Sequence, residues 1–74
     1  MERPLPIGSH HDETGWLNDD RGELVLRRDG SGRWRLDVGL ILGWRARKLV
    51  GRRVKVEGTR IEFDVLAARR IVPE

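Results

Sequence analysis

The sequence predicts an all-β domain of five short strands, with one helix between the third and fourth strands. Three features indicate this arrangement. Apolar and polar residues alternate in several short segments, glycine-containing turns separate these segments, and one ten-residue stretch follows a helical period instead. The chain has 74 residues, which allows one small domain, and its regularly spaced apolar residues argue against disorder.

The first two strands are expected at residues 14–17 and 23–28. The five residues between them, Asn-Asp-Asp-Arg-Gly, are types that favour tight turns. In the second strand the leucines point toward the core, because side chains alternate between the two faces of a strand. The outward-facing positions of this strand are Val25 and Arg27.

The third strand is expected at residues 33–38, after a tight hairpin at residues 29–32 with the sequence Asp-Gly-Ser-Gly. Its alternation is that of a half-buried antiparallel strand. Trp34 falls on the buried face, while Arg33 and Arg35 fall on the outer face.

Residues 41–50 are expected to form the helix, which ends at Gly51. Trp44 lies opposite the apolar side and is expected to be exposed; alternatively, Gly43 distorts the helix and turns this ring against the barrel. The apolar side covers the open end of the barrel and consists of Leu42, Ala46, Leu49 and Val50.

The last two strands are expected at residues 52–58 and from Ile61 onward, joined by a turn near residues 58–60. Phe63 is assigned to the core, on a face shared with Ile61 and Val65. Leu66 breaks the alternation, which indicates a bulge or bend.

Residues 1–13 are expected to form an extended arm before a domain at residues 14–72, because two prolines and a glycine interrupt regular structure there. The predicted strand order resembles that of an OB-fold barrel. An SH3-like barrel, the main competitor, has no helix of this length at that position.

Two motifs carry the resemblance further. Residues 49–58 resemble the helix exit and fourth strand of small bacterial OB domains, in which Leu-x-Gly precedes Val-x-Val-x-Gly, and Gly-Trp-Leu at residues 15–17 resembles their opening strand. Residues 14–72 are also similar to a family of short, uncharacterised bacterial proteins. That second resemblance implies no activity.

Arginine dominates the charge of the chain. Thirteen of the fifteen cations are arginine, and residues 38–74 carry nine cations against four acids. Arginine favours bidentate contacts with phosphate and stacking on flat rings. We therefore expect an anionic partner, with single-stranded DNA or RNA first. The alternative is a solvated surface whose arginine content reflects a GC-rich genome.

The expected nucleic-acid surface is the outer face of the second and third strands. Trp16 is expected to point outward, where it would stack a base while neighbouring guanidinium groups hold phosphates. The alternative is that the arm covers this ring, through Leu5, Pro6 or Ile7. The residues assigned to the surface are Trp16, Arg27, Arg33 and Arg35, with Arg53 and Lys55 as auxiliary contacts.

A second hypothesis, of a different class, is a protein-interaction or homodimer module that uses Trp16 or Trp44. Exposed tryptophans are enriched at interaction hot spots. The residues assigned to this contact are Trp44, Arg47 and Lys48.

Catalytic chemistry has little support in the sequence. There is no cysteine or tyrosine, and the adjacent His10 and His11 point apart in an extended chain, so they do not share a metal ion. We expect a protein that is not an enzyme and has no metal or cofactor. No apolar run approaches the roughly twenty residues that cross a bilayer, so no membrane partner is expected, and the protein is expected to be cytoplasmic.

Overall fold

The five strands and the helix follow each other in the predicted order. The computed structural model describes residues 7–74. The elements are β1 (His10–Asp20), β2 (Glu23–Arg28), β3 (Arg33–Asp37), α1 (Leu40–Ala46), the short 3-10 helix η1 (Arg47–Leu49), β4 (Arg53–Glu62) and β5 (Val65–Pro73).

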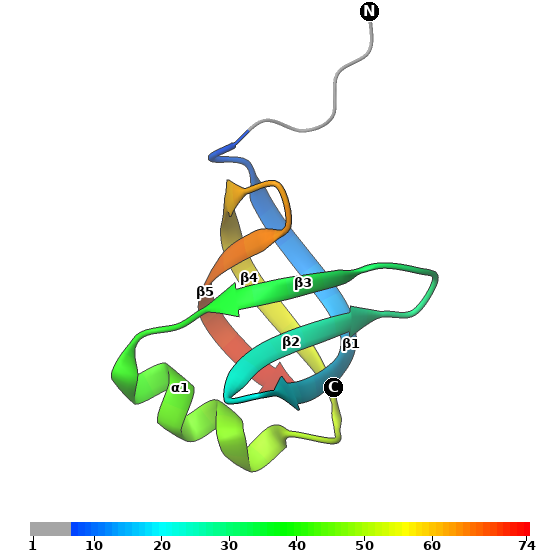
Figure 1. Cartoon of the computed structure of the whole chain (residues 1–74), viewed down its shortest axis with the longest axis vertical. Coiled ribbons are helices and arrows are strands. Elements are labelled where there is room, and N and C mark those ends of the chain that lie inside the picture. Colours follow the sequence, from blue (N-terminus) through cyan, green and yellow to red (C-terminus); the bar gives the residue numbers. More distant parts are fainter. Residues whose placement is uncertain (1–6) are drawn as a thin grey trace, which may run out of the picture.

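The sheet closes into a barrel because β1 pairs with a strand on each of its sides. The order around the ring is β1-β2-β3-β5-β4, and β4 pairs again with β1. All neighbours are antiparallel except β3 and β5, which run parallel. Figure 1 shows α1 beneath one end of the barrel, with the β4–β5 hairpin and the start of β1 at the other end.

The core lies inside this ring and at its helix-covered end. Leu17, Leu26 and Leu66 are fully buried, and Trp34 is 7% exposed, which confirms its assignment to the core. From the helix, Ala46 is buried in the same cluster, with Leu42 and Leu49 packed against it. The predicted role of the helix as a cover is therefore confirmed.

The helix differs in detail from the prediction. Regular α-helix ends at Ala46, and one 3-10 turn carries the chain to the expected stop at Gly51, whose φ of +90° suits glycine. Val50 is partly exposed rather than part of the covered side. Within residues 7–74, no helix is long and apolar enough to cross a bilayer.

Strand β1 begins at His10, four residues before the expected start, and runs to Asp20. His10 pairs with Thr59 and Glu13 with Val56, so this part of the expected arm belongs to the sheet. Backbone hydrogen bonds hold a polar strand as well as an apolar one, and polar residues give no periodic signal. Residues 1–6 of the expected arm lie outside the described part of the chain.

The expected turn near residues 58–60 is wrong, because β4 continues through it and turns at Phe63–Asp64. Gly58 instead allows β4 and β5 to approach closely, because a Cβ on this residue would lie 2.5 Å from the Ala67 carbonyl oxygen. Phe63 is consequently 81% exposed in the turn, and its assignment to the core is wrong.

The predicted bulge has a counterpart at the end of the β4–β5 ladder. Leu66 pairs with Arg60 and Val65 with Glu62, so one extra residue, Ile61, is accommodated on β4. Ile61 is partly exposed as a result, and it does not share a buried face with Val65.

Candidate nucleic-acid interface

Four of the six residues expected to bind nucleic acid lie in one line across the outer face of the barrel. The register pairs Arg27 with Arg33 on one side and with Trp16 on the other. Trp16 is in turn paired with Arg53 on β4. Paired residues project from the same face of a sheet. We call the four residues the Arg–Trp row.

Trp16 projects outward from the middle of this row. Its side chain is 46% exposed, and the Arg53 guanidinium lies 5.7 Å from the ring centroid, within the range of a cation–π contact. Part of the ring is therefore covered and part stays open. Of the arm residues considered as a cover, Ile7 is itself exposed, and Leu5 and Pro6 lie outside the described residues.

Arg53 is held by two carboxylates. Its Nη2 donates to Asp29 at 2.9 Å, and its Nε donates to Glu74 at 2.9 Å. The hydrogen bond from Arg53 lowers the pKa of Asp29, and the two acids raise the pKa of Arg53. With two carboxylate partners and the Trp16 ring beside it, Arg53 is less available to a phosphate than an unpaired arginine.

Arg35 projects from the same face as the row, but it also has a carboxylate partner. Its Nε and Nη2 donate to Asp64 at 3.2 and 3.0 Å. These hydrogen bonds raise the pKa of Arg35 and lower the pKa of Asp64. The pair ties β3 to the turn after β4, so Arg35 has less charge to offer a ligand than its strand position indicates.

Val25 is buried, contrary to the expectation that it faces solvent. Its register partners on the outer face, Asn18 and Arg35, have longer side chains, and longer neighbours across a sheet cover a short side chain between them. The residue lines a shallow hollow beside the Arg–Trp row. This hollow is lined by Asn18, Asp19, Asp20, Val25, Arg27, Gly32, Arg33 and Val50.

Of the three arginines in the row, Arg27 and Arg33 have the weakest interactions with carboxylates. In the part of the chain that the structure describes, Arg27 has no ion pair. The Arg33 guanidinium lies 3.5 Å from Asp20, a weak contact between two exposed groups. Lys55 lies two residues beyond Arg53 on the outer face of β4 and is also exposed.

The acids beside the row were read in the sequence only as turn residues. Asp19 borders the hollow and accepts from Arg47 Nη1 at 2.7 Å, while Arg47 Nη2 donates to the Gly22 carbonyl. Arg47 is therefore drawn toward the β1–β2 turn. The structure does not join it to Trp44, with which it was grouped in the protein-interaction hypothesis.

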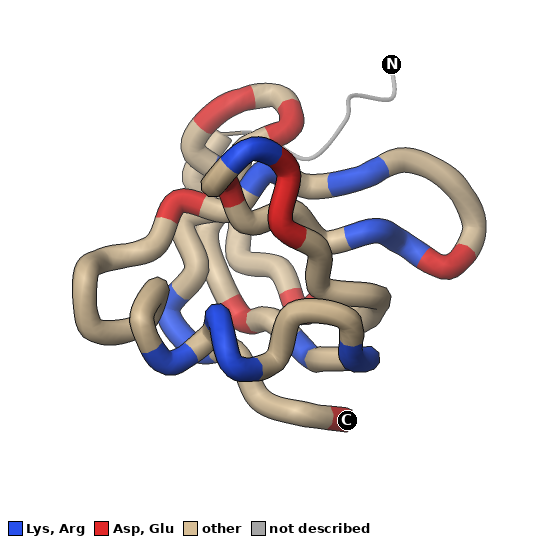
Figure 2. The backbone as a smooth tube through the Cα atoms, turned by 60° about the horizontal axis from the view of Figure 1, so that its bottom comes forward, with Lys and Arg blue, Asp and Glu red and all other residues tan. Residues whose placement is uncertain are grey.

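The outer side of α1 forms a second exposed surface. Leu40 is 94% exposed, Ile41 72% and Trp44 67%, and Lys48 Nζ lies 4.5 Å from the Trp44 ring centroid. We call these four residues the helix patch. Figure 2 shows basic and no acidic residues along the α1–η1 segment. The sequence does not identify these two apolar residues as part of the surface, because Leu40 precedes the predicted helix and Ile41 is its first residue.

The adjacent histidines have separate partners. The His11 ring hydrogen-bonds to Ser9 Oγ at 2.8 Å and to Glu13 at 3.1 Å, whereas His10 lies 3.3 Å from Asp12. Among residues 7–74, no three side chains of the metal-binding types come close enough to hold one ion.

Comparisons with known proteins give a family and no further match. Residues 14–74 match a family described as "Protein of unknown function (DUF5818)". This agrees with the resemblance to uncharacterised short proteins that the sequence indicated. Searches of curated proteins and of solved structures gave no match.

Proposed function

Because the chain belongs to the DUF5818 family, whose description names no activity, we propose a function from the surface of the barrel itself. The proposed function is a non-enzymatic OB-fold-like module that binds single-stranded DNA or RNA weakly. The contact surface is the Arg–Trp row, with Arg27 and Arg33 as its phosphate contacts and Trp16 as its stacking platform.

The strand arrangement supports an OB-fold. Five strands in the ring order β1-β2-β3-β5-β4, with the helix between β3 and β4, fit the five-stranded Greek-key barrel of that fold. Such barrels bind oligonucleotides on the outer face of their second and third strands and on the adjoining loops. The Arg–Trp row crosses this same face.

The observation that carries the proposal is the register of the row. Arg27 lies between Trp16 and Arg33 on neighbouring strands, so a stacking ring and two guanidinium groups are available to one strand of nucleic acid. Stacking on an aromatic ring is sequence-tolerant, and phosphate contacts read no sequence. We expect low affinity and slight base preference, because the row offers one exposed ring, Trp16, and only two arginines without strong carboxylate partners, Arg27 and Arg33.

The test is fluorescence anisotropy of a labelled oligothymidine at several salt concentrations. Trp16→Ala should weaken binding and leave the salt dependence unchanged, since the ring carries no charge. Arg27→Ala should weaken binding and flatten the plot of log affinity against log salt by about 0.7, the value for one phosphate contact on a single strand. Arg45→Ala, which removes an exposed arginine on α1, is the matched control and should change neither quantity. Absence of binding at low salt would overturn the proposal.

A second candidate function is supported by the helix patch. Three large apolar side chains that are each more than half exposed are uncommon on the surface of a monomer. We propose as the alternative that this surface contacts another protein, a second copy of the chain being the simplest case. Light scattering tests it: a dimer that dissociates on Trp44→Ala supports the alternative, and a monomer at all concentrations contradicts self-association.

A further inference from the structure

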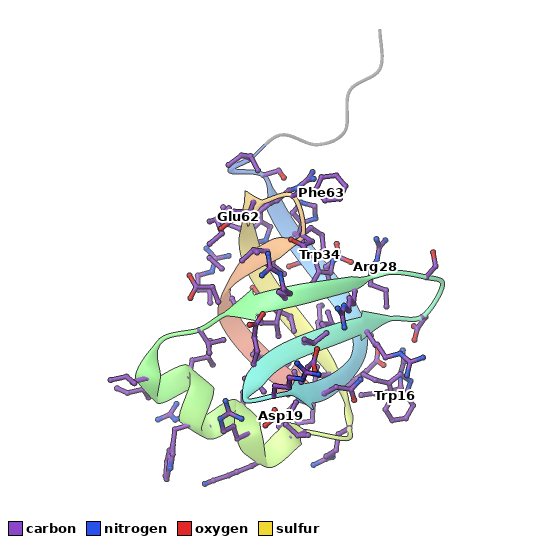
Figure 3. The ribbon with its side chains drawn as sticks, viewed as in Figure 1. Trp16, Asp19, Arg28, Trp34, Glu62 and Phe63 are labelled. Atoms are coloured by element: carbon purple, nitrogen blue, oxygen red, sulfur yellow. The ribbon has the colours of Figure 1, made fainter. Side chains whose placement is uncertain are left out.

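The end of the barrel opposite α1 is lined by polar side chains. His11 and Glu13 occupy inward-facing positions of β1, and Arg60 occupies the corresponding position of β4, where it is almost completely buried. Trp34 of β3 lies beneath them, with its ring centroid 5.1 Å from that of His11. Figure 3 shows Trp34, Arg28 and Phe63 toward this end, away from Trp16 and Asp19.

A hollow opens here, lined by residues of β1, β2, β3 and β4 and of the β2–β3 and β4–β5 turns. Arg28 and Arg33 line it from β2 and β3, and Phe63 lines it from the β4–β5 turn. We call it the barrel mouth. It lies over the inward-facing side of the strands and shares Arg33 with the Arg–Trp row.

One buried polar group at the barrel mouth has no hydrogen-bond partner among residues 7–74. Trp34 lines the hollow, and its Nε1–H is fully covered without an acceptor among the described residues. A buried donor without an acceptor destabilises the folded state. The polar groups of this end are therefore not completely satisfied within the described residues.

Phe63 is an exposed ring at the rim of the mouth. It is 81% exposed, and the Arg60 guanidinium carbon lies 5.2 Å from its ring centroid. Position 63 belongs to a two-residue turn that does not require an aromatic side chain. An exposed ring with a cation on one side is a platform for stacking a second flat ring.

The charges at the mouth favour an anion. Glu13 is shared between His11 at 3.1 Å and Arg28 at 3.7 Å, and Asp64 is paired with Arg35. Both carboxylates that line the hollow thus have basic partners inside the chain. Arg33, held only weakly by Asp20, remains accessible to a ligand at this end.

We propose that the barrel mouth binds one nucleotide, with its base on Phe63 and its phosphate on Arg28 and Arg33, whose contacts with Glu13 and Asp20 are both long, at 3.7 and 3.5 Å. Gly32 and Arg33 line both the mouth and the hollow beside the Arg–Trp row, so the two sites adjoin. To this extent the inference rests on the proposed function: a nucleic-acid strand bound along the row would place one further nucleotide in the mouth. The bound nucleotide can also be a free mononucleotide, which has the same chemistry.

The experiment uses the indole N–H signals of the whole chain in a nitrogen–proton NMR spectrum. The three tryptophans report separately on the row (Trp16), the mouth (Trp34) and the helix patch (Trp44), and Trp16→Phe and Trp44→Phe assign the signals. The ligands are adenosine monophosphate, inorganic phosphate and a short oligothymidine with a 5′ phosphate. The mononucleotide should shift the Trp34 signal and the backbone amides of the Phe63–Asp64 turn, and leave the Trp44 signal in place.

Phe63→Ala should weaken mononucleotide binding about tenfold, the loss expected for one stacking contact. Ile61→Ala, a change two residues away in the same hairpin, should leave it unchanged. Both side chains are exposed or partly exposed, so neither change should unfold the barrel. An unchanged affinity in Phe63→Ala, or an equal Trp34 shift with inorganic phosphate alone, overturns the proposal.

The same spectra distinguish a free mononucleotide from a bound oligonucleotide, and binding at the mouth from binding at the Arg–Trp row. If the mononucleotide moves Trp34 while no oligonucleotide binds the row, the mouth is a nucleotide site and the proposed function fails. If only the oligonucleotide moves Trp34, together with Trp16, the mouth serves the bound strand. If the oligonucleotide moves Trp16 and no ligand moves Trp34, the row stands and the mouth proposal is wrong.

Discussion

The two ends of the barrel are closed by different kinds of contact. At the α1 end, Ala46 is buried, and Leu42 and Leu49 pack on the core. At the barrel mouth, Glu13 hydrogen-bonds to His11 and lies in ion-pair contact with Arg28. Apolar contact needs little directional precision, whereas a polar cluster is stable only if every group finds a partner. Among residues 7–74, the buried Trp34 N–H beneath the mouth has no acceptor, so the polar end is less completely satisfied than the apolar end.

The largest expected effect is at the residue that supports the mouth from inside. Trp34→Ala should lower the free energy of unfolding by about 3–5 kcal/mol, because it leaves a cavity under the polar cluster. A chain of this length has only roughly 4–11 kcal/mol in total, so the variant should lose a large part of its stability and melt at a much lower temperature. Thermal melting followed by circular dichroism measures this. A melting curve like that of the parent would show that the mouth does not depend on the ring.

A smaller effect is expected at the closed end, where a matched pair exists on one helix. Leu42→Ala should lower the free energy of unfolding by about 1–3 kcal/mol, since Leu42 is only partly buried against the core. Leu40→Ala removes the same atoms from a side chain that is 94% exposed and should change stability by less than about 0.5 kcal/mol. Urea unfolding of both variants tests whether α1 stabilises the barrel through its inner side alone.

The smallest expected effect is a loss of stability in acid. Hydrogen bonds from Arg53 and Arg35 lower the pKa values of Asp29 and Asp64 in the folded state. A carboxyl group whose pKa is lower in the folded state stabilises the fold above its unfolded pKa, and this contribution disappears as the pH falls below about 4. Both pairs are exposed, so the effect should be small and weaker in high salt.

Asp64→Asn isolates the contribution of the mouth to this acid effect. It removes the ion pair with Arg35, so melting temperature should fall less between pH 6 and pH 3 than it does in the parent. If parent and variant lose the same stability over this range, the Arg35–Asp64 pair makes no contribution that depends on pH.

The sequence was most informative where burial follows a simple period. Alternation placed Trp34 in the core and Trp16 outside it, and the helical repeat identified Leu42 and Ala46 as covering residues, because side-chain direction is fixed by secondary structure. The same alternation put Arg27 and Arg33 beside Trp16, so most of the candidate site could be anticipated.

Other features lay beyond a reading of single segments. Gly58 predicts a turn because glycine suits both turns and close strand contacts. That turn would put Phe63 within the last strand, whereas β4 continues to Glu62 and Phe63 lies in the turn that follows. The partners of Arg35 and Arg53 could not be anticipated, since each ion pair joins residues more than twenty positions apart. Only the folded structure shows which arginines are paired with carboxylates.

The double pairing of β1 has a consequence for how the chain is made. β1 can pair with β2 as soon as both have left the ribosome, but its other edge must wait for β4, and β3 must wait for β5, the last strand of the chain. Non-local pairing of this kind folds slowly. Until β4 and β5 are available, two strand edges stay unpaired and open to aggregation. The exposed charges on the outer faces of β2 and β3, such as Arg27 and Arg33, disfavour association of these edges before the barrel closes.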